Sequence, residues 1–215
     1  LLIFLILFIL WSIRPKSELY QKKFSVNSKL IVIYAVFIIN AGIWLGLTQT
    51  NQTIVNPPWI HHKQYHRLAV ALSQGEVSIT TGLEAELSAL ANPYDTAFRQ
   101  NNISNSYDVW DLAFFEGKFY VYFGIVPVLL FYLPYYLIFG SAFPTYFGIY
   151  IMGSAILAGV FYLMWQIVRN YFKKTPFLLY VVLSVIVGNS IGTIPIIMRP
   201  DFYSLPIMCA LCFTI

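Results

Sequence analysis

The side chains able to do acid or base chemistry are concentrated in one polar stretch of this chain, residues 48–118. Seven of the nine acidic residues lie there: Glu76, Glu84, Glu86, Asp95, Asp108, Asp111 and Glu116. A carboxylate can take a proton from an attacking hydroxyl group, and a nearby cation can hold a negatively charged leaving group. We therefore expect any catalytic site to be built in this stretch.

Three aspartates stand in sequences that combine an acid with a cation or an aromatic residue. Asp95 ends Asn92-Pro93-Tyr94-Asp95, and Asp111 follows a Trp. Asp201 lies outside the stretch and follows Arg199. Asp95 and Asp201 have structural alternatives, because Asn-Pro sequences favour turns and an Arg–Asp pair can close the end of a helix.

The composition indicates a membrane protein. Hydrophobic residues make up 59% of the chain and charged residues only 10%, whereas soluble domains contain roughly 45–50% apolar and about 25% charged residues. The chain has no glycine-rich phosphate loop, no Gly-x-Ser-x-Gly elbow and no basic stripe interleaved with aromatic residues. We expect a lipid-embedded protein that binds no nucleic acid and is not driven by ATP.

Apolar segments of suitable length position the polar stretch. A membrane helix needs about 20 apolar residues, and residues 30–47, 145–168 and 177–198 meet or approach this length. Residues 1–13 are expected to end a preceding membrane helix and residues 207–215 to begin a further one, in a longer protein. The predicted fold class is all-α: a polytopic transmembrane helix bundle with a long, partly helical first outer loop.

Basic residues assign the two sides of the membrane. The loop 14–29 carries five Lys or Arg and one Glu, and the loop 169–176 carries three basic residues and no acid. Cytoplasmic loops carry an excess of Lys and Arg, so both loops are predicted to be cytoplasmic. The polar stretch and the loop 199–206 with Asp201 then share the outer face.

This topology makes the aromatic segment 119–140 a special case. An odd number of crossings must separate the outer loop from Arg169, yet two apolar segments lie between them. Residues 119–140 contain Gly124, Pro127, Pro134 and nine aromatic residues, which suit an interfacial or re-entrant segment. An ordinary kinked span is the alternative.

Two surface helices are expected within the polar stretch. Residues 59–73 follow two prolines and stop before Gly75, as helices often do. Their apolar stripe can lie on a membrane surface. Thr81-Gly82-Leu83-Glu84 has the spacing of a capping box, which begins a second helix.

A histidine pair and a cysteine pair have spacings found in metal or redox sites, but neither is predicted to form such a site. His62 and His66 could hold a metal from one helix face, but no acid lies between them, and contact with lipid head groups or solvent is favoured. Cys209 and Cys212 have C-x-x-C spacing in an apolar helix with no His or charge nearby. We expect them to be small core residues.

The order of these features resembles bacterial proteins of the C-type membrane glycosyltransferase superfamily over about residues 30–205. The shared order is a membrane helix, a long outer loop with surface helices, an aromatic run, and then an Arg-x-Asp sequence. The motifs are Asn92-Pro93-Tyr94-Asp95-x3-Arg99, Trp110-Asp111, Gly117-Lys118-Phe119-Tyr120-Val121-Tyr122-Phe123-Gly124-x2-Pro127 and Arg199-x-Asp201. The aromatic run after Gly117-Lys118 is the most specific of them.

The resemblance implies a multi-pass protein of the bacterial plasma membrane that transfers a sugar from a polyprenyl phosphate to an extracytoplasmic acceptor. It implies a catalytic acid in the first outer loop, commonly near the start of that loop, and a second acid at the position of Asp201. Residues 48–73 contain no Asp or Glu, which leaves Asp95 or Asp111 as the base. The remaining implied roles are phosphate binding by Arg99, Lys118 and Arg199, a second acid or divalent metal ligand at Asp201, and sugar contact or interface anchoring by Tyr120 and Tyr122.

A transporter or non-catalytic membrane protein with an outer lid is the second hypothesis. Transporters place polar or ionisable groups near the bilayer midplane. Within the expected spans, only Asn40, Gln166 and Asn189 are polar beyond hydroxyl groups. The sequence leaves open the sugar, the acceptor and the oligomeric state.

Overall fold

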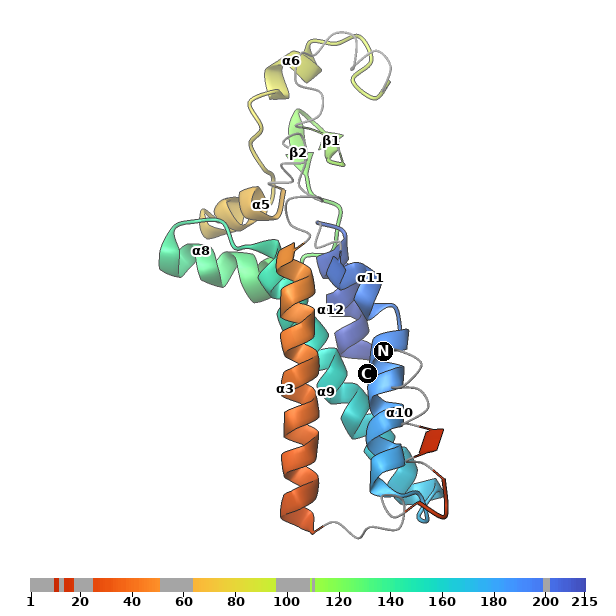
Figure 1. Ribbon diagram of the computed structural model, residues 1–215. Helices are drawn as coiled ribbons and strands as arrows, with labels where there is room; N and C mark the ends of the chain where they lie inside the picture. Colours follow the sequence, from red (N-terminus) through yellow and green to blue (C-terminus); the bar gives the residue numbers. More distant parts are fainter. Residues whose placement is uncertain are drawn as a thin grey trace.

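The computed structural model describes residues 10–11, 14–17, 25–50, 64–95, 109, 111–198 and 202–215. Helices make up 68% of the structure, in agreement with the predicted all-α class, and the described strands form one small two-stranded sheet. Figure 1 shows a helix bundle, two helices laid across one end of it, and the sheet beyond them.

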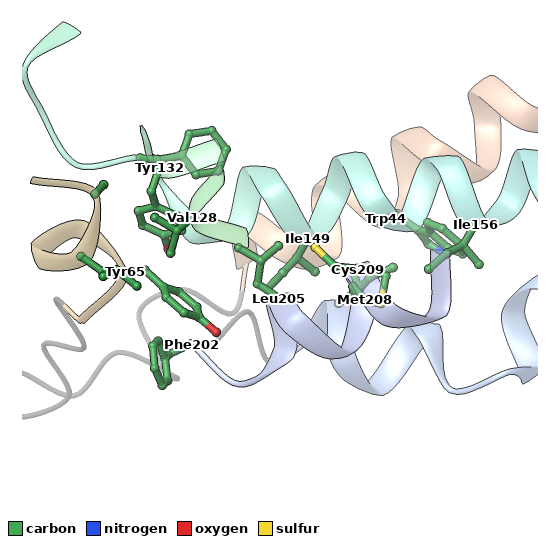
Figure 2. Close-up of a cluster of buried hydrophobic side chains, with 14 of the residues drawn as sticks. Trp44, Tyr65, Val128, Tyr132, Ile149, Ile156, Phe202, Leu205, Met208 and Cys209 are labelled. Carbon is green, nitrogen blue, oxygen red and sulfur yellow. The ribbon is translucent and has the colours of Figure 1, made fainter. Parts of the chain in front are cut away.

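The bundle is built around one long helix. This helix is α9, Thr145–Tyr171, and its partners are α3 (Val26–Thr50), α10 (Phe177–Ser190), α11 (Thr193–Met198) and α12 (Ser204–Thr214). The side chains of Trp44, Ile149, Ile156 and Met208 are fully buried where these helices meet (Figure 2). A single apolar core therefore runs along the bundle.

Among the described residues, two helices are long and apolar enough to cross a bilayer: Val26–Leu47 within α3, and α9. Along α3, large apolar side chains are more than half exposed: Ile31, Tyr34, Ile38, Ile39 and Ile43. A continuous exposed apolar surface of this kind suits a lipid environment or a partner rather than water. Both helices extend beyond the segments expected from the sequence, 30–47 and 145–168.

The structure divides the segment 177–198, expected to be one helix, into α10 and α11. Gly192 adopts a φ of +86°, a left-handed conformation that ends helices and that glycine adopts without strain. Pro195 then falls in the first turn of α11, where its missing N–H is tolerated. Asn189, near the end of α10, accepts a hydrogen bond from the Trp44 indole at 3.0 Å and donates one to Asn40 at 3.0 Å.

Two helices lie across the end of the bundle (Figure 1). They are α5, Gln64–Ser73, and α8, Leu133–Phe139, which continues the π-helical turn η2, Val128–Tyr132. The rings of Tyr65 and Tyr132 are 5.5 Å apart. Pro134 has no N–H for the carbonyl four residues earlier, which accounts for the irregular turn.

The segment 119–140 was expected to be an interfacial segment or a kinked span. In the structure it contains both strand and helix. It begins as a strand and becomes helical only near Pro127. The helical part packs on α5 and runs crosswise to α3 (Figure 1). A left-handed Gly140, with a φ of +65°, ends it.

The ends of the loop helices follow their sequence signals. The N–H of Gly75 donates to the Leu72 carbonyl at 3.1 Å, and that of Glu76 donates to the Ala71 carbonyl at 2.9 Å. These two bonds form a Schellman motif. Residues 59–63, expected to begin this helix, lie outside the described residues.

The expected capping box forms in part. The Glu84 carboxylate accepts the N–H of Thr81 at 2.6 Å and that of Gly82 at 2.9 Å, and the short helix α6, Glu84–Ser88, follows. Burial raises the pKa of Glu84, but these hydrogen bonds outweigh it, and the net effect lowers the pKa.

The sheet is a tight hairpin that the sequence analysis missed. Strand β1, Ala113–Phe115, pairs with β2, Lys118–Tyr120, through an antiparallel register in which Phe115 lies opposite Lys118. The two turn residues, Glu116 and Gly117, have φ values of +48° and +76°. Two positive φ angles define a type I′ turn, which matches the twist of paired strands.

We expect replacement of Gly117 by Ala to loosen this hairpin. An added Cβ would lie 3.7 Å from the Ser88 hydroxyl, an ordinary contact, so the cost is conformational, roughly 1–2 kcal/mol for a left-handed non-glycine residue. Amide hydrogen exchange over residues 113–120 should become faster, with α9 unchanged.

Glu116 provides the control for this experiment, because it is the non-glycine residue of the same turn with a positive φ. Glu116→Gly removes strain and should slow exchange over the same residues. Equal exchange in wild type and both variants would show that the turn does not hold the hairpin.

Candidate functional site

The carboxylate of Asp111, one of the predicted acids, accepts hydrogen bonds from two tyrosines. Its Oδ1 accepts a hydrogen bond from the Tyr122 hydroxyl at 3.0 Å, and its Oδ2 accepts one from the Tyr203 hydroxyl. Its own φ is +60°, a conformation that is uncommon for a residue with a side chain. Asp111 is half-buried.

The hairpin explains why Asp111 and Tyr122 meet. Ala113 lies opposite Tyr120 in the register, so the residues two positions further out on each side, Asp111 and Tyr122, face each other at the open end. Side chains two apart along a strand share a face, so Lys118, Tyr120 and Tyr122 follow one another along the same face of the hairpin. Phe119 is fully buried on the other face.

Tyr203 comes from the opposite end of the described sequence, between α11 and α12. Its hydrogen bond to Asp111 joins residues 92 positions apart. The outer loop and the segment after α11, predicted to share one membrane face, are therefore in direct contact. Tyr203 lies two residues after Asp201.

Aromatic rings support this junction. Phe123 contacts Phe202 with ring centroids 4.8 Å apart and Tyr203 with centroids 5.3 Å apart. Tyr65 of α5 contacts Phe202 at 4.5 Å, as Figure 2 shows. The rings of Phe123, which follows the hairpin, and of Tyr65, on α5, thus pack against residues 202–203, just before α12.

Two phenol groups near the junction have a raised pKa. For Tyr122, partial desolvation raises the pKa most, followed by the hydrogen bond to Asp111 and the negative charge of Asp111. For Tyr65, burial is the main cause, followed by the nearby Tyr132 and Cys209. Both hydroxyl groups therefore remain protonated at neutral pH and can act as donors.

The other predicted site residues are not gathered at Asp111. Asp95 is exposed and ends an Asx turn, in which the Asn92 side chain accepts the N–H of Tyr94 at 3.1 Å. This geometry favours its structural interpretation. Arg99, Arg199 and Asp201 lie outside the described residues.

Lys118 lies at the turn end of the hairpin, four residues along the chain from Tyr122. At about 3.4 Å per residue in an extended strand, their backbones are roughly 14 Å apart. Lys118 lines a separate polar cavity of about 690 Å³ with His66, Arg67 and Glu76. Arg67, which the sequence analysis did not select, adds a second cation to that cavity.

The remaining predictions have simple outcomes. His66 packs edge-on against Tyr136 at 5.5 Å, and His62 lies outside the described residues. Cys209 is buried and Cys212 is half-buried, and both are free thiols. Within the described ranges, no three His, Cys, Asp or Glu side chains converge to hold a metal ion.

The residues that the sequence analysis missed are Phe123, Phe202 and Tyr203. Phe123 belongs to the aromatic run, and the other two directly follow Asp201, but no periodicity relates segments so far apart. No family model, curated protein or solved structure matches this chain. The functional assignment therefore rests on residues and geometry.

Proposed function

We propose that this chain belongs to a multi-pass membrane protein that transfers a sugar from a polyprenyl phosphate to an extracytoplasmic acceptor, a cell-envelope glycan or lipid. Asp111 is the proposed general base. The observation that carries the proposal is the contact of Asp111 with Tyr203. It joins the acid of the first outer loop to Tyr203, which follows Asp201, the second acid that the resemblance implies, by two residues in the sequence.

The arrangement of the helices supports a membrane setting for this chemistry. The apolar face of α3 would contact lipid, and α5 and α8, which run crosswise to it, would lie at the outer membrane surface. Lys29 lies at the other end of α3, and Arg169, Lys173 and Lys174 lie at or just after the corresponding end of α9, on the proposed cytoplasmic side. The Asp111 junction is then at the outer interface, where a lipid-linked sugar would be presented.

The proposed step is a displacement at the anomeric carbon. The acceptor hydroxyl gives its proton to Asp111 while its oxygen bonds to that carbon, and the bond from the carbon to the phosphate oxygen breaks. Polyprenyl phosphate leaves as an anion. An ionised carboxylate has about four acceptor sites, and the two tyrosine bonds leave room for the acceptor.

The distance of Lys118 from Asp111 changes its proposed role. Lys118 lies at the turn end of the hairpin, whereas Asp111 lies beside Tyr122 at its open end, so Lys118 is not positioned to hold the phosphate that leaves as Asp111 takes the proton. We assign that phosphate to Arg199, four residues before Tyr203. Lys118 and Arg67 would instead hold a polar or anionic part of the donor or acceptor in their own cavity.

One observation favours a non-catalytic membrane protein as the second candidate. Both Asp111 oxygens accept a hydrogen bond from a tyrosine hydroxyl. In a non-catalytic protein, the role of these two bonds would be to attach the outer loop to the bundle. The transporter form of this candidate gains less support. Asn40 and Asn189, two of the polar residues within the expected spans, bind each other.

Sugar transfer by the full-length protein in its own membranes tests the proposal. Polyprenyl-phosphate sugar and glycan products are measured for wild type, Asp111→Asn, Asp201→Asn and Asp95→Asn at matched protein levels. Loss of product in the first two variants, with donor accumulating and Asp95→Asn active, supports it. Unchanged products in all three variants would remove the catalytic assignment.

A further inference from the structure

A second cavity lies at the opposite end of the bundle from Asp111. It has a volume of about 600 Å³ and lies between the start of α3, the end of α9 and the start of α10. Its walls are mostly apolar and aromatic, and two cations, Lys29 and Arg169, are part of its lining. The volume is in the range typical of ligand-binding pockets.

Both cations contact aromatic rings of the same cavity. The Lys29 ammonium lies 5.8 Å from the centroid of the Phe177 ring, and the Arg169 guanidinium lies 5.0 Å from that of Trp165. These contacts hold the two positive charges on the cavity wall by cation–π attraction. Each side chain retains N–H donors for an anion.

No acid neutralises this end of the bundle within the described residues. The ranges 14–17, 25–35 and 160–182 contain no Asp or Glu, but they contain further cations. These are Arg14, Lys16, Lys173 and Lys174. An apolar groove with two cations, Lys29 and Arg169, in its lining is complementary to a molecule with an anionic head and a hydrocarbon tail.

We propose that this groove binds one anionic phospholipid of the cytoplasmic leaflet, with its phosphate between Lys29 and Arg169 and an acyl chain along Leu30, Ile33 and Phe161. Anionic lipids are concentrated in that leaflet, and basic pockets between membrane helices recognise their head groups. The groove lies on the opposite membrane side from the proposed transfer site. The proposal that the groove binds a lipid therefore does not depend on whether the protein transfers a sugar.

Native mass spectrometry of the full-length protein with phosphatidylglycerol or phosphatidylcholine tests the proposal. Wild type should retain one phosphatidylglycerol in preference to phosphatidylcholine. Lys29→Gln with Arg169→Gln should weaken retention by about fivefold or more for each cation removed. Ile33→Trp, which fills the groove without changing its charge, should also release the lipid.

Lys173→Gln with Lys174→Gln is the matched control, because it removes the same charge from the same end at residues that do not line the groove. This variant should retain the lipid within about twofold of wild type. Equal losses in both double variants, or retention in Ile33→Trp, would reduce the effect to adsorption on a basic surface. Absence of bound phosphatidylglycerol from wild type would overturn the proposal.

Discussion

Replacing Asp111 by Asn is expected to lower sugar transfer by about 10²–10⁴-fold, because a positioned general base typically contributes that factor. The amide cannot take a proton from the acceptor hydroxyl. Its oxygen can still accept one tyrosine hydroxyl, so the outer loop should remain attached. Product formation from a polyprenyl-phosphate sugar by the full-length protein, at matched protein levels, measures the effect.

The two tyrosines separate catalysis from a structural tie. Tyr122→Phe with Tyr203→Phe removes both hydrogen bonds to Asp111 but keeps the carboxylate and the aromatic rings. If Asp111 is the base, this double variant should retain transfer within about tenfold of wild type, whereas Asp111→Asn does not. Equal loss of transfer in both variants would indicate that Asp111 acts by attaching the outer loop to the bundle and not as the base.

Replacing Gly153 by Leu is expected to destabilise the bundle by about 3 kcal/mol, at the upper end of the usual cost of overpacking. An added Cβ at this position would lie 3.2 Å from Met208 and 3.3 Å from both Ile197 and Trp44. All three side chains are buried, and they come from three different helices, so none can move without disturbing the core. The midpoint of thermal unfolding in detergent should fall.

Gly42 is the matched control, because it is a helical glycine of α3 where an added Cβ meets nothing within 4 Å. Gly42→Leu makes the same chemical change in open space and gains helix propensity of up to about 1 kcal/mol. Its unfolding midpoint should be unchanged or higher. Similar losses in both variants would mean that the contacts around Gly153 do not limit stability.

Local features of the outer loop could be predicted where one short segment contains all the interacting groups. The end of α5 at Gly75 and the bonds of Glu84 depend on residues within five positions of each other. The hairpin could also have been predicted, since Glu116-Gly117 separates two aromatic strands. The second strand is hard to recognise in the sequence because the aromatic run after Lys118 continues directly toward the helix that begins near Pro127.

The sequence identified candidate residues for the site, but it did not show which of them contact one another. The sequence pointed to Asp95 and Asp111 equally, since each stands in a motif of the outer loop. Only the folded chain separates them: Asp95 is exposed in a turn, whereas Asp111 receives hydroxyl groups from the hairpin and from Tyr203. Likewise, Lys118 shares a strand face with Tyr122, yet strand geometry separates it from the acid.

The sequence by itself determined the chemical class of each segment. Apolar composition, basic loops and capping residues act through solvent and near neighbours, so they can be recognised without knowing the fold. The tertiary structure alone decided which distant residues meet: Asp111 with Tyr203, Asn40 with Asn189, and Lys29 with Arg169 in one groove. These contacts depend on how helices pack and where they break, as at Gly192, and no local pattern specifies that packing.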